Sequence, residues 1–238
     1  MNENAHIVTG FDEDLGHIET LLLEMGGLVE AQINDGVQAL ITRDVEAGQR
    51  VRRRDKQVDA FESKIDELAI RLIAMRQPMA VDLRRVVTAL KVTSSLERMG
   101  DYAKNMGKRV EVLAEADNMG GATDAIERMS GIVREMVRDV LDAFIARDTA
   151  MAYEIRDRDE QVDQLHNTMF REMLTYMMER PENITPCMHL LFIAKNVERM
   201  GDHTTGIAEQ IIYMVDGALP DDNRQKSDET AFFSGDEA

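Results

Sequence analysis

Cysteine, tryptophan and proline are scarce in this 238-residue chain, which has one cysteine, no tryptophan and four prolines. The single cysteine, Cys187, excludes an internal disulfide and indicates a reducing compartment. Because it lies between Pro186 and an apolar run, we predict a buried structural thiol and not a nucleophile. Only 5% of the residues are aromatic, whereas 44% are hydrophobic and 17 are methionine, a composition that favours packed helices over a β-sandwich.

Long apolar segments are also missing. The longest unbroken apolar run, residues 190–194, is far below the roughly 20 residues of a membrane span, and residues 1–10 lack the basic and apolar segments of a secretory signal. We therefore predict a soluble, cytoplasmic protein without direct membrane insertion. Only 28 Lys and Arg stand against 45 Asp and Glu, and the net charge of −17 disfavours nucleic acid and anionic lipid as partners.

The chain is rich in helical periodicity. Apolar residues recur at steps of three and four across residues 12–42, the spacing of an amphipathic helix. Asp124, followed three residues later by Glu127, resembles the N-cap of another helix. The pattern predicts an all-α fold of six long helices, over about residues 12–42, 45–75, 81–113, 124–146, 149–178 and 187–215.

The second half of the chain repeats the first. Residues 39–44 match residues 143–148, 104 positions later, and residues 97–101 match residues 198–202, 101 positions later. The change of offset falls in the connection between the second and third helices of a half, where a duplicated bundle tolerates a length change. We predict two tandem, sequence-related three-helix bundles at residues 1–116 and 124–217, with a linker at residues 117–123 and a disordered acidic tail at residues 218–238.

Four pairs of acidic residues coincide after this duplication. The two carboxylates of each pair stand four residues apart and share one helix face, where like charges cost an isolated helix about 0.2–0.5 kcal/mol. The second and third helices of a bundle with short connections are antiparallel neighbours, so the two pairs of each half would face one another and suit Mg, Mn, Fe or Ca. The predicted metal ligands are Asp55, Asp59, Glu97 and Asp101 in the first half, and Asp159, Asp163, Glu198 and Asp202 in the second.

Other acids and the histidines give weaker signals. Glu62 and His166 occupy equivalent positions one turn beyond the acidic pairs and would extend them unequally. His203 stands next to Asp202 but about 100° around the helix, so we expect it to support a ligand or to face a partner. Three further acidic pairs lack an acidic counterpart in the other half, and we predict that they are solvated surface: Glu62/Asp66, Glu111/Glu115 and Glu135/Asp139.

Two alternatives to metal binding by a non-enzyme remain open. In the first, the chain is a metal-free helical scaffold in which Gly100 and Gly201 permit close packing. Asp55 and Asp159 would then pair with arginines such as Arg52, Arg54, Arg98, Arg156 and Arg199. In the second, the carboxylates belong to a metalloenzyme. The sequence lacks the paired Glu-x-x-His motifs of di-iron oxidases, a Gly-rich phosphate loop, Gly-x-Ser-x-Gly and His-Glu-x-x-His, so we nominate no catalytic residue and do not expect an enzyme.

The repeated motifs resemble those of a known family. Glu-Arg-Met-Gly-Asp occurs at residues 97–101 and 198–202, each time after an Asp-x-x-Val-Asp helix, and the combination resembles the PhoU family over roughly residues 15–215. The continuation Asp-Tyr-Ala-Lys-Asn at residues 101–105 also looks like the family. The second half departs from it with Gly206 at the position of Asn105, so equal metal affinity of the two halves does not follow.

The resemblance implies a cytoplasmic, helical and often homodimeric regulator of phosphate uptake that turns over no substrate. Its implied partners are the ATPase subunit of a phosphate-specific ABC transporter and a two-component sensor histidine kinase. The protein would be an adaptor between them and a negative regulator, repressing the phosphate-starvation response when phosphate is plentiful. The resemblance also implies iron or zinc clusters on the four acidic pairs.

Overall fold

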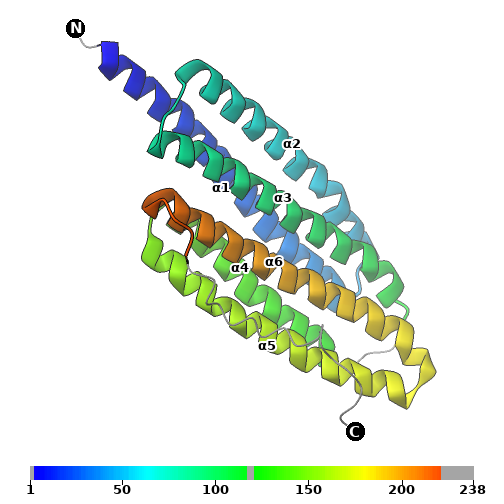
Figure 1. The fold of residues 1–238 in the computed structure, drawn as a ribbon. Helices are drawn as coiled ribbons and strands as arrows, with labels where there is room; N and C mark the ends of the chain where they lie inside the picture. The colour runs from blue at the N-terminus through cyan, green and yellow to red at the C-terminus, as the bar shows by residue number, and fades with distance from the viewer. Residues whose placement is uncertain (1–2, 117–120, 221–238) are drawn as a thin grey trace.

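The computed structural model describes residues 3–116 and 121–220, and over these residues the chain forms six long helices and one short 3₁₀ helix, η1 (Figure 1). These two ranges contain no β-strand, which confirms the predicted all-α fold. The helices are α1 (Glu3–Thr42), α2 (Val45–Arg76), α3 (Val81–Leu113), α4 (Ala122–Ala146), α5 (Thr149–Glu179) and α6 (Ile184–Asp216), with η1 (Pro181–Asn183) directly before α6.

The six helices form two three-helix bundles that pack side by side, as the duplication predicts. Helices α1, α2 and α3 contact one another, as do α4, α5 and α6, and the bundles meet through α3 against α6 and α1 against α4. Figure 1 shows all six helices along one common direction, with α2 and α5 at the outer edges and α3 beside α6 in the middle. None of the described helices combines the length and the apolar composition that crossing a membrane requires.

The apolar stripe predicted on α1 lies in the core. Its eight positions are each 3% exposed or less, because residues three and four apart line one helix face and pack against the neighbouring helices. The stripe consists of Leu15, Ile18, Leu22, Met25, Val29, Ile33, Val37 and Leu40.

Cys187 on α6 is fully buried and burial raises its pKa, which confirms the predicted burial of this thiol.

Two predicted helix starts are wrong. The N-cap of α4 is Gly121, so Asp124 lies inside the first turn, where the positive end of the helix dipole favours its charge. Helix α6 begins at Ile184, so Pro186 lies in its first turn and not in a loop. Proline is tolerated there because its missing N–H would have no partner within the helix.

The predicted linker and tail are described only in part. Residues 122 and 123 of the predicted linker already belong to α4, whereas residues 117–120 lie outside the described residues. The predicted acidic tail lies outside them from residue 221 onward.

Equivalent turns connect the first two helices of each bundle. Arg43 and Arg147 have positive φ angles of 55° and 58°. The next residues, Asp44 and Asp148, each accept a hydrogen bond from the backbone N–H three residues on, at 2.9 and 3.1 Å. Such an N-cap stabilises a helix by about 1 kcal/mol. The duplication therefore includes the backbone conformation of this turn as well as the acidic pairs.

Helices α2 and α3 come into backbone contact at a pair of glycines. A Cβ added to Gly48 would lie 2.7 Å from the carbonyl oxygen of Gly107, and a Cβ added to Gly107 would lie 2.6 Å from that of Gly48. The equivalent residues of the second half are Ala152 and Ala208, both fully buried. Because α5 and α6 carry methyl groups where α2 and α3 have none, the two halves do not share one helix separation at this crossing.

The glycine crossing gives a stability prediction. Gly107→Ala is expected to lower the free energy of unfolding by about 1–3 kcal/mol, because the new methyl group meets backbone that moves only if α2 and α3 separate. The matched control is Gly16→Ala in α1, where nothing lies within 4 Å of the added atom. This control should raise the free energy of unfolding by up to about 1 kcal/mol. Urea unfolding followed by circular dichroism measures both, and equal stabilities would contradict the close crossing.

Candidate functional site

The structure brings the first four predicted ligands together between α2 and α3. Asp55 and Asp59 lie on α2, and Glu97 and Asp101 lie on the neighbouring helix α3. The charges of Asp59 and Asp101 raise the pKa of Asp55, after burial, and those of Asp101 and Asp59 act in the same direction on the pKa of Glu97. The charges of these four residues, called the first patch below, therefore interact with one another.

Burial makes the charge of the first patch unfavourable. Asp55 is only 3% exposed, Glu97 and Asp101 are partly buried, and Asp59 is exposed. Burial is the largest cause that raises the pKa of both Asp55 and Glu97, and neighbouring carboxylates add to it. An ionised patch of this kind is stabilised by any cation that reaches it.

A lysine that the sequence analysis did not consider lies in this patch. The Nζ atom of Lys104 lies 2.5 Å from Oδ2 of Asp55 and 3.0 Å from Oδ1 of Asp101. Hydrogen bonds to these two carboxylates raise the pKa of Lys104 above its ordinary range. The spacing of three residues between Asp101 and Lys104 on one helix could have predicted their ion pair from the sequence. Asp55 thus pairs with a lysine, and not with the arginines considered as its partners.

Glu62 extends the first patch. Burial raises the pKa of Glu62, followed by the charges of Asp66 and Asp59, and the charge of Glu62 in turn raises the pKa of Glu97. These interactions support the expectation that Glu62 extends the acidic pairs and not the expectation that it is solvated surface. The exposed pair Glu111/Glu115 on α3 and beyond agrees with the prediction of solvated surface.

The second set of predicted ligands lies between α5 and α6 and is more deeply buried. Asp159, Asp163 and Glu198 are 1%, 3% and 4% exposed, and Asp202 is partly buried. Asp159 lies directly against Gly201, where a Cβ would collide with its carboxylate. Because α5 and α6 are antiparallel, Asp163, one turn on, lies opposite the turn that carries Glu198. We call Asp159, Asp163, Glu198 and Asp202 the second patch.

The two patches differ in their neighbours. Gly100, in the first motif, faces the side chains of Val58 and Gln32, whereas Gly201, in the second, faces Asp159. Position 205, equivalent to Lys104, is a buried threonine. His166, equivalent to Glu62, is 3% exposed. One motif sequence therefore serves two different local arrangements, and both glycines allow close packing as the sequence suggested.

His203 faces the other half of the same chain. Its Nε2 lies 3.5 Å from Oη of Tyr102, the equivalent residue of the first half, and the two ring centroids are 5.7 Å apart. Burial lowers the pKa of His203, so the neutral ring is favoured. His203 thus takes part in a contact between α3 and α6, which lies beside both patches, and its expected role in supporting a ligand or facing a partner stays a prediction.

The patches supply the donors for a hard cation but not a finished coordination shell. Carboxylate oxygens are the ligands that Mg, Mn and Fe accept. Within residues 10–116 and 121–220, no three His, Cys, Asp or Glu side chains are placed closely enough to hold a metal ion. The donor chemistry and the burial fit a metal, whose binding would require the carboxylates to turn toward one another.

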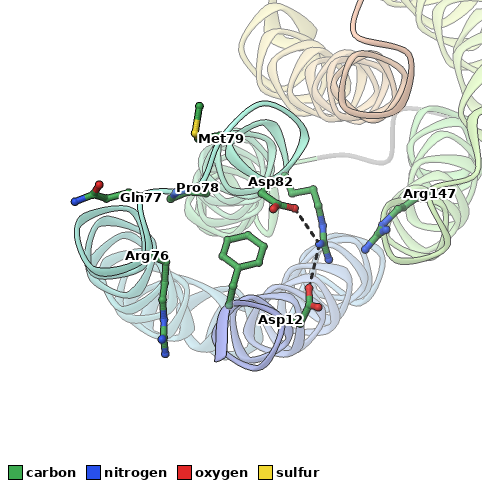
Figure 2. A pocket seen from close by; sticks show the side chains of 9 residues that line it. Asp12, Arg76, Gln77, Pro78, Met79, Asp82 and Arg147 are labelled. Carbon is green, nitrogen blue, oxygen red and sulfur yellow. Dashed lines mark hydrogen bonds and ion pairs between the residues drawn. The ribbon is translucent and has the colours of Figure 1, made fainter. Parts of the chain in front are cut away.

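A separate pocket of about 640 Å³ lies where the start of α1 meets the α2–α3 connection (Figure 2). Arg85, one of its lining residues, has Nη1 3.3 Å from Oδ1 of Asp12 and 3.8 Å from Oδ1 of Asp82. Figure 2 shows Arg147 directed toward Asp12. No sequence motif points to this pocket, because its arginines lie on different helices. Two aspartates already neutralise Arg85, so we assign the candidate function to the repeated acidic patches.

The unfavourable charge of the first patch leads to a prediction for the metal-free protein. The folded state raises the pKa of Glu97 above its ordinary value of 4.5, so the ionised carboxylate lowers stability at pH values above that range. Glu97→Gln should therefore raise the free energy of unfolding by at least about 0.2–0.5 kcal/mol, the cost of one like-charge pair.

Urea unfolding in the presence of a chelator tests this prediction. The gain from Glu97→Gln should be larger at about pH 8 than at about pH 5.5, because the wild-type carboxyl takes up a proton as the pH falls. The control Glu111→Gln also removes one charge of an acidic pair on α3, but this side chain is exposed. A destabilised Glu97→Gln protein would contradict the electrostatic account.

Comparison with known proteins agrees with the geometry of two repeated bundles. The model of the PhoU domain matches the chain twice, at residues 22–110 and 126–211. A Caulobacter vibrioides protein named "Phosphate-specific transport system accessory protein PhoU homolog" is 48% identical over 94% of this chain and 97% of its own length. A Rhizobium meliloti protein of the same name is 44% identical over 96% of each chain.

Solved structures lead to the same family. The crystal structure of PhoU from Pseudomonas aeruginosa matches with a TM-score of 0.83 and 38% identity, covering 87% of this chain and all of the other. The phosphate transport system regulatory protein PhoU from Streptococcus pneumoniae matches with a TM-score of 0.80 and 28% identity, covering 89% of this chain and 99% of the other. With two matched domains and close full-length relatives, this chain belongs to the PhoU family.

Proposed function

We propose that this protein is an accessory protein of a phosphate-specific transport system and a negative regulator of phosphate uptake. The observation that carries the proposal is the full-length similarity to relatives with that name, together with the presence of both acidic motifs in both halves. In this proposal the protein acts in the cytoplasm as a homodimer. It represses the phosphate-starvation response when phosphate is plentiful and turns over no substrate.

The proposed mode of action is that of an adaptor. Its two partners are the ATPase subunit of a phosphate ABC transporter and a sensor histidine kinase. Regulation requires that the partners bind one conformation of the protein more tightly than another, since a ligand shifts an equilibrium only through such a difference. The contact between α3 and α6, called the seam below, suits this role. One patch lies on each side of the seam, and Tyr102 contacts His203 across it.

Metal ions are the proposed ligands of the patches. Iron or zinc, or else Mg, Mn or Ca, would bind to Asp55, Asp59, Glu97 and Asp101 in the first patch, and to Asp159, Asp163, Glu198 and Asp202 in the second. A bound cation supplies positive charge that neutralises the carboxylates. Neutralised patches would fix how α2 lies on α3 and how α5 lies on α6, and thereby define the surface that a partner meets.

A metal-free helical scaffold is the second candidate, and one observation favours it. Lys104 already neutralises part of the first patch through Asp55 and Asp101, so this half has a counter-ion without a metal. Elemental analysis of protein purified without a tag separates the two candidates.

The adaptor role is tested by co-purification. The full-length tagged protein should recover the transporter ATPase and the sensor kinase from cross-linked cells, in proportions that differ between phosphate-rich and phosphate-starved growth. An unrelated helical protein with the same tag is the control. Recovery of neither partner under either condition would refute the adaptor role.

The metal is tested by changing one acid in each patch. The double variant Glu97→Gln with Glu198→Gln should lose most of its metal, because each patch loses one of four carboxylate donors and one negative charge. Partner recovery should fall with the metal content, which mass spectrometry of the purified protein measures. The control changes two exposed acids, Glu111→Gln with Glu135→Gln. Unchanged metal content and partner binding in the first variant would remove the metal from the mechanism.

A further inference from the structure

One side chain of the first half already supplies the positive charge that the first patch attracts. Nζ of Lys104 lies 2.5 Å from Oδ2 of Asp55 and 3.0 Å from Oδ1 of Asp101. Asp55 belongs to α2, whereas Lys104 and Asp101 belong to α3. The ammonium group therefore joins the two helices through two of the four first-patch carboxylates, and the Asp55 side chain that it contacts is only 4% exposed.

An ammonium group and a metal ion cannot use these oxygens at the same time. Metal ions bind carboxylate oxygens at about 2.0–2.6 Å, so an ion bound to both oxygens would overlap with Nζ, which lies 2.5 and 3.0 Å from them. An ammonium group and a metal ion held beside the same two oxygens would also repel each other strongly. The hydrogen bonds of Lys104 are charge-assisted at both ends, the strong class of hydrogen bond, so breaking them opposes metal entry.

The second patch has no lysine at the equivalent position. Residue 205, 101 positions after Lys104, is a threonine whose hydroxyl donates to the backbone carbonyl of Asp202 at 2.8 Å. Lys195 lies 2.9 Å from Glu198 in this half, a contact between residues three apart on one helix. A lysine at the position of Lys104 is thus a feature of the first half and not of the repeated motif.

We infer that Lys104 is the resident cation of the first patch, and that a metal ion enters this patch only by displacing the lysine ammonium from Asp55 and Asp101. The inference rests on the proposed metal binding, and the experiments below separate its failure from the failure of that proposal. Lys104 is well placed to leave, because 42% of its side chain is already exposed. Metal binding would exchange a bridge between α2 and α3 for a free positive charge at the rim of the patch.

Chemical labelling of the wild-type protein tests the displacement directly. The full-length, chelator-treated protein is acetylated with a limiting amount of acetic anhydride, with and without Mn²⁺, and the labelled lysines are identified by mass spectrometry. Mn²⁺ should increase the labelling of Lys104 several-fold relative to Lys64 and Lys108, two exposed lysines of the same bundle. Unchanged labelling of Lys104 in protein that has bound Mn²⁺ would overturn the inference.

Mn²⁺ affinity gives the second test. The second patch is first disabled with Asp159→Asn and Glu198→Gln, so that Mn²⁺ binding, counted by electron paramagnetic resonance, reports on the first patch. Lys104→Met keeps most of the length of the side chain and removes its charge. It should tighten Mn²⁺ binding about tenfold or more, in line with the strength of hydrogen bonds between charged groups. Lys104→Arg should leave the affinity low, because a cation remains.

A control variant distinguishes displacement from general electrostatics. Lys108→Met removes the same charge from an exposed position on α3 and should change the affinity less than twofold. Equal affinity of Lys104→Met and the parent protein would refute the inference alone, as would equal gains from Lys104→Met and Lys108→Met. Absence of Mn²⁺, Fe²⁺ and Zn²⁺ binding in every variant, the wild type included, would refute the proposed metal role and the inference with it.

Discussion

The charge of carboxylates enclosed between antiparallel helices has to be balanced, and this requirement governs both halves of the molecule. Helices α2 and α3 hold Asp55 and Glu97 where burial raises the pKa of each, and neighbouring acids raise them further. A buried, uncompensated charge is among the most costly groups in a protein. The structure meets this cost in the first half with Lys104, which connects the two helices that create the patch.

The duplicated halves solve the same problem at different packing distances. Gly48 and Gly107 let α2 and α3 meet backbone to backbone, whereas α5 and α6 carry alanines at the equivalent crossing. The second patch is more deeply buried than the first, and its Asp159 lies against Gly201. Two sites that began as copies therefore differ in depth, neighbours and resident cation.

In the proposed mechanism, regulation through such sites would depend on the seam between the bundles. Helices α3 and α6 each carry one acidic motif and pack against one another along the middle of the molecule. Tyr102 and His203 directly follow the last acid of each motif and meet across this seam. Each of these two residues is therefore the chain neighbour of a patch acid, so a shift of α3 on α2 would also move the contact between the halves. In the proposed mechanism, this contact would connect the charge of a patch with the surface offered to a partner.

The sequence by itself determined the helices, the duplication and the candidate acids, because the period of apolar residues and the repeat of motifs are properties of the chain alone. It also paired α2 with α3, whereas the burial of the α1 stripe in the core came from the tertiary structure. Only the tertiary structure decided which charges meet. It showed that Glu62 joins the first patch, that Lys104 bridges Asp55 and Asp101, and that His203 faces Tyr102. These contacts depend on the register and distance between helices, set by packing residues such as Gly107 that carry no charge and no motif for the chemistry they position.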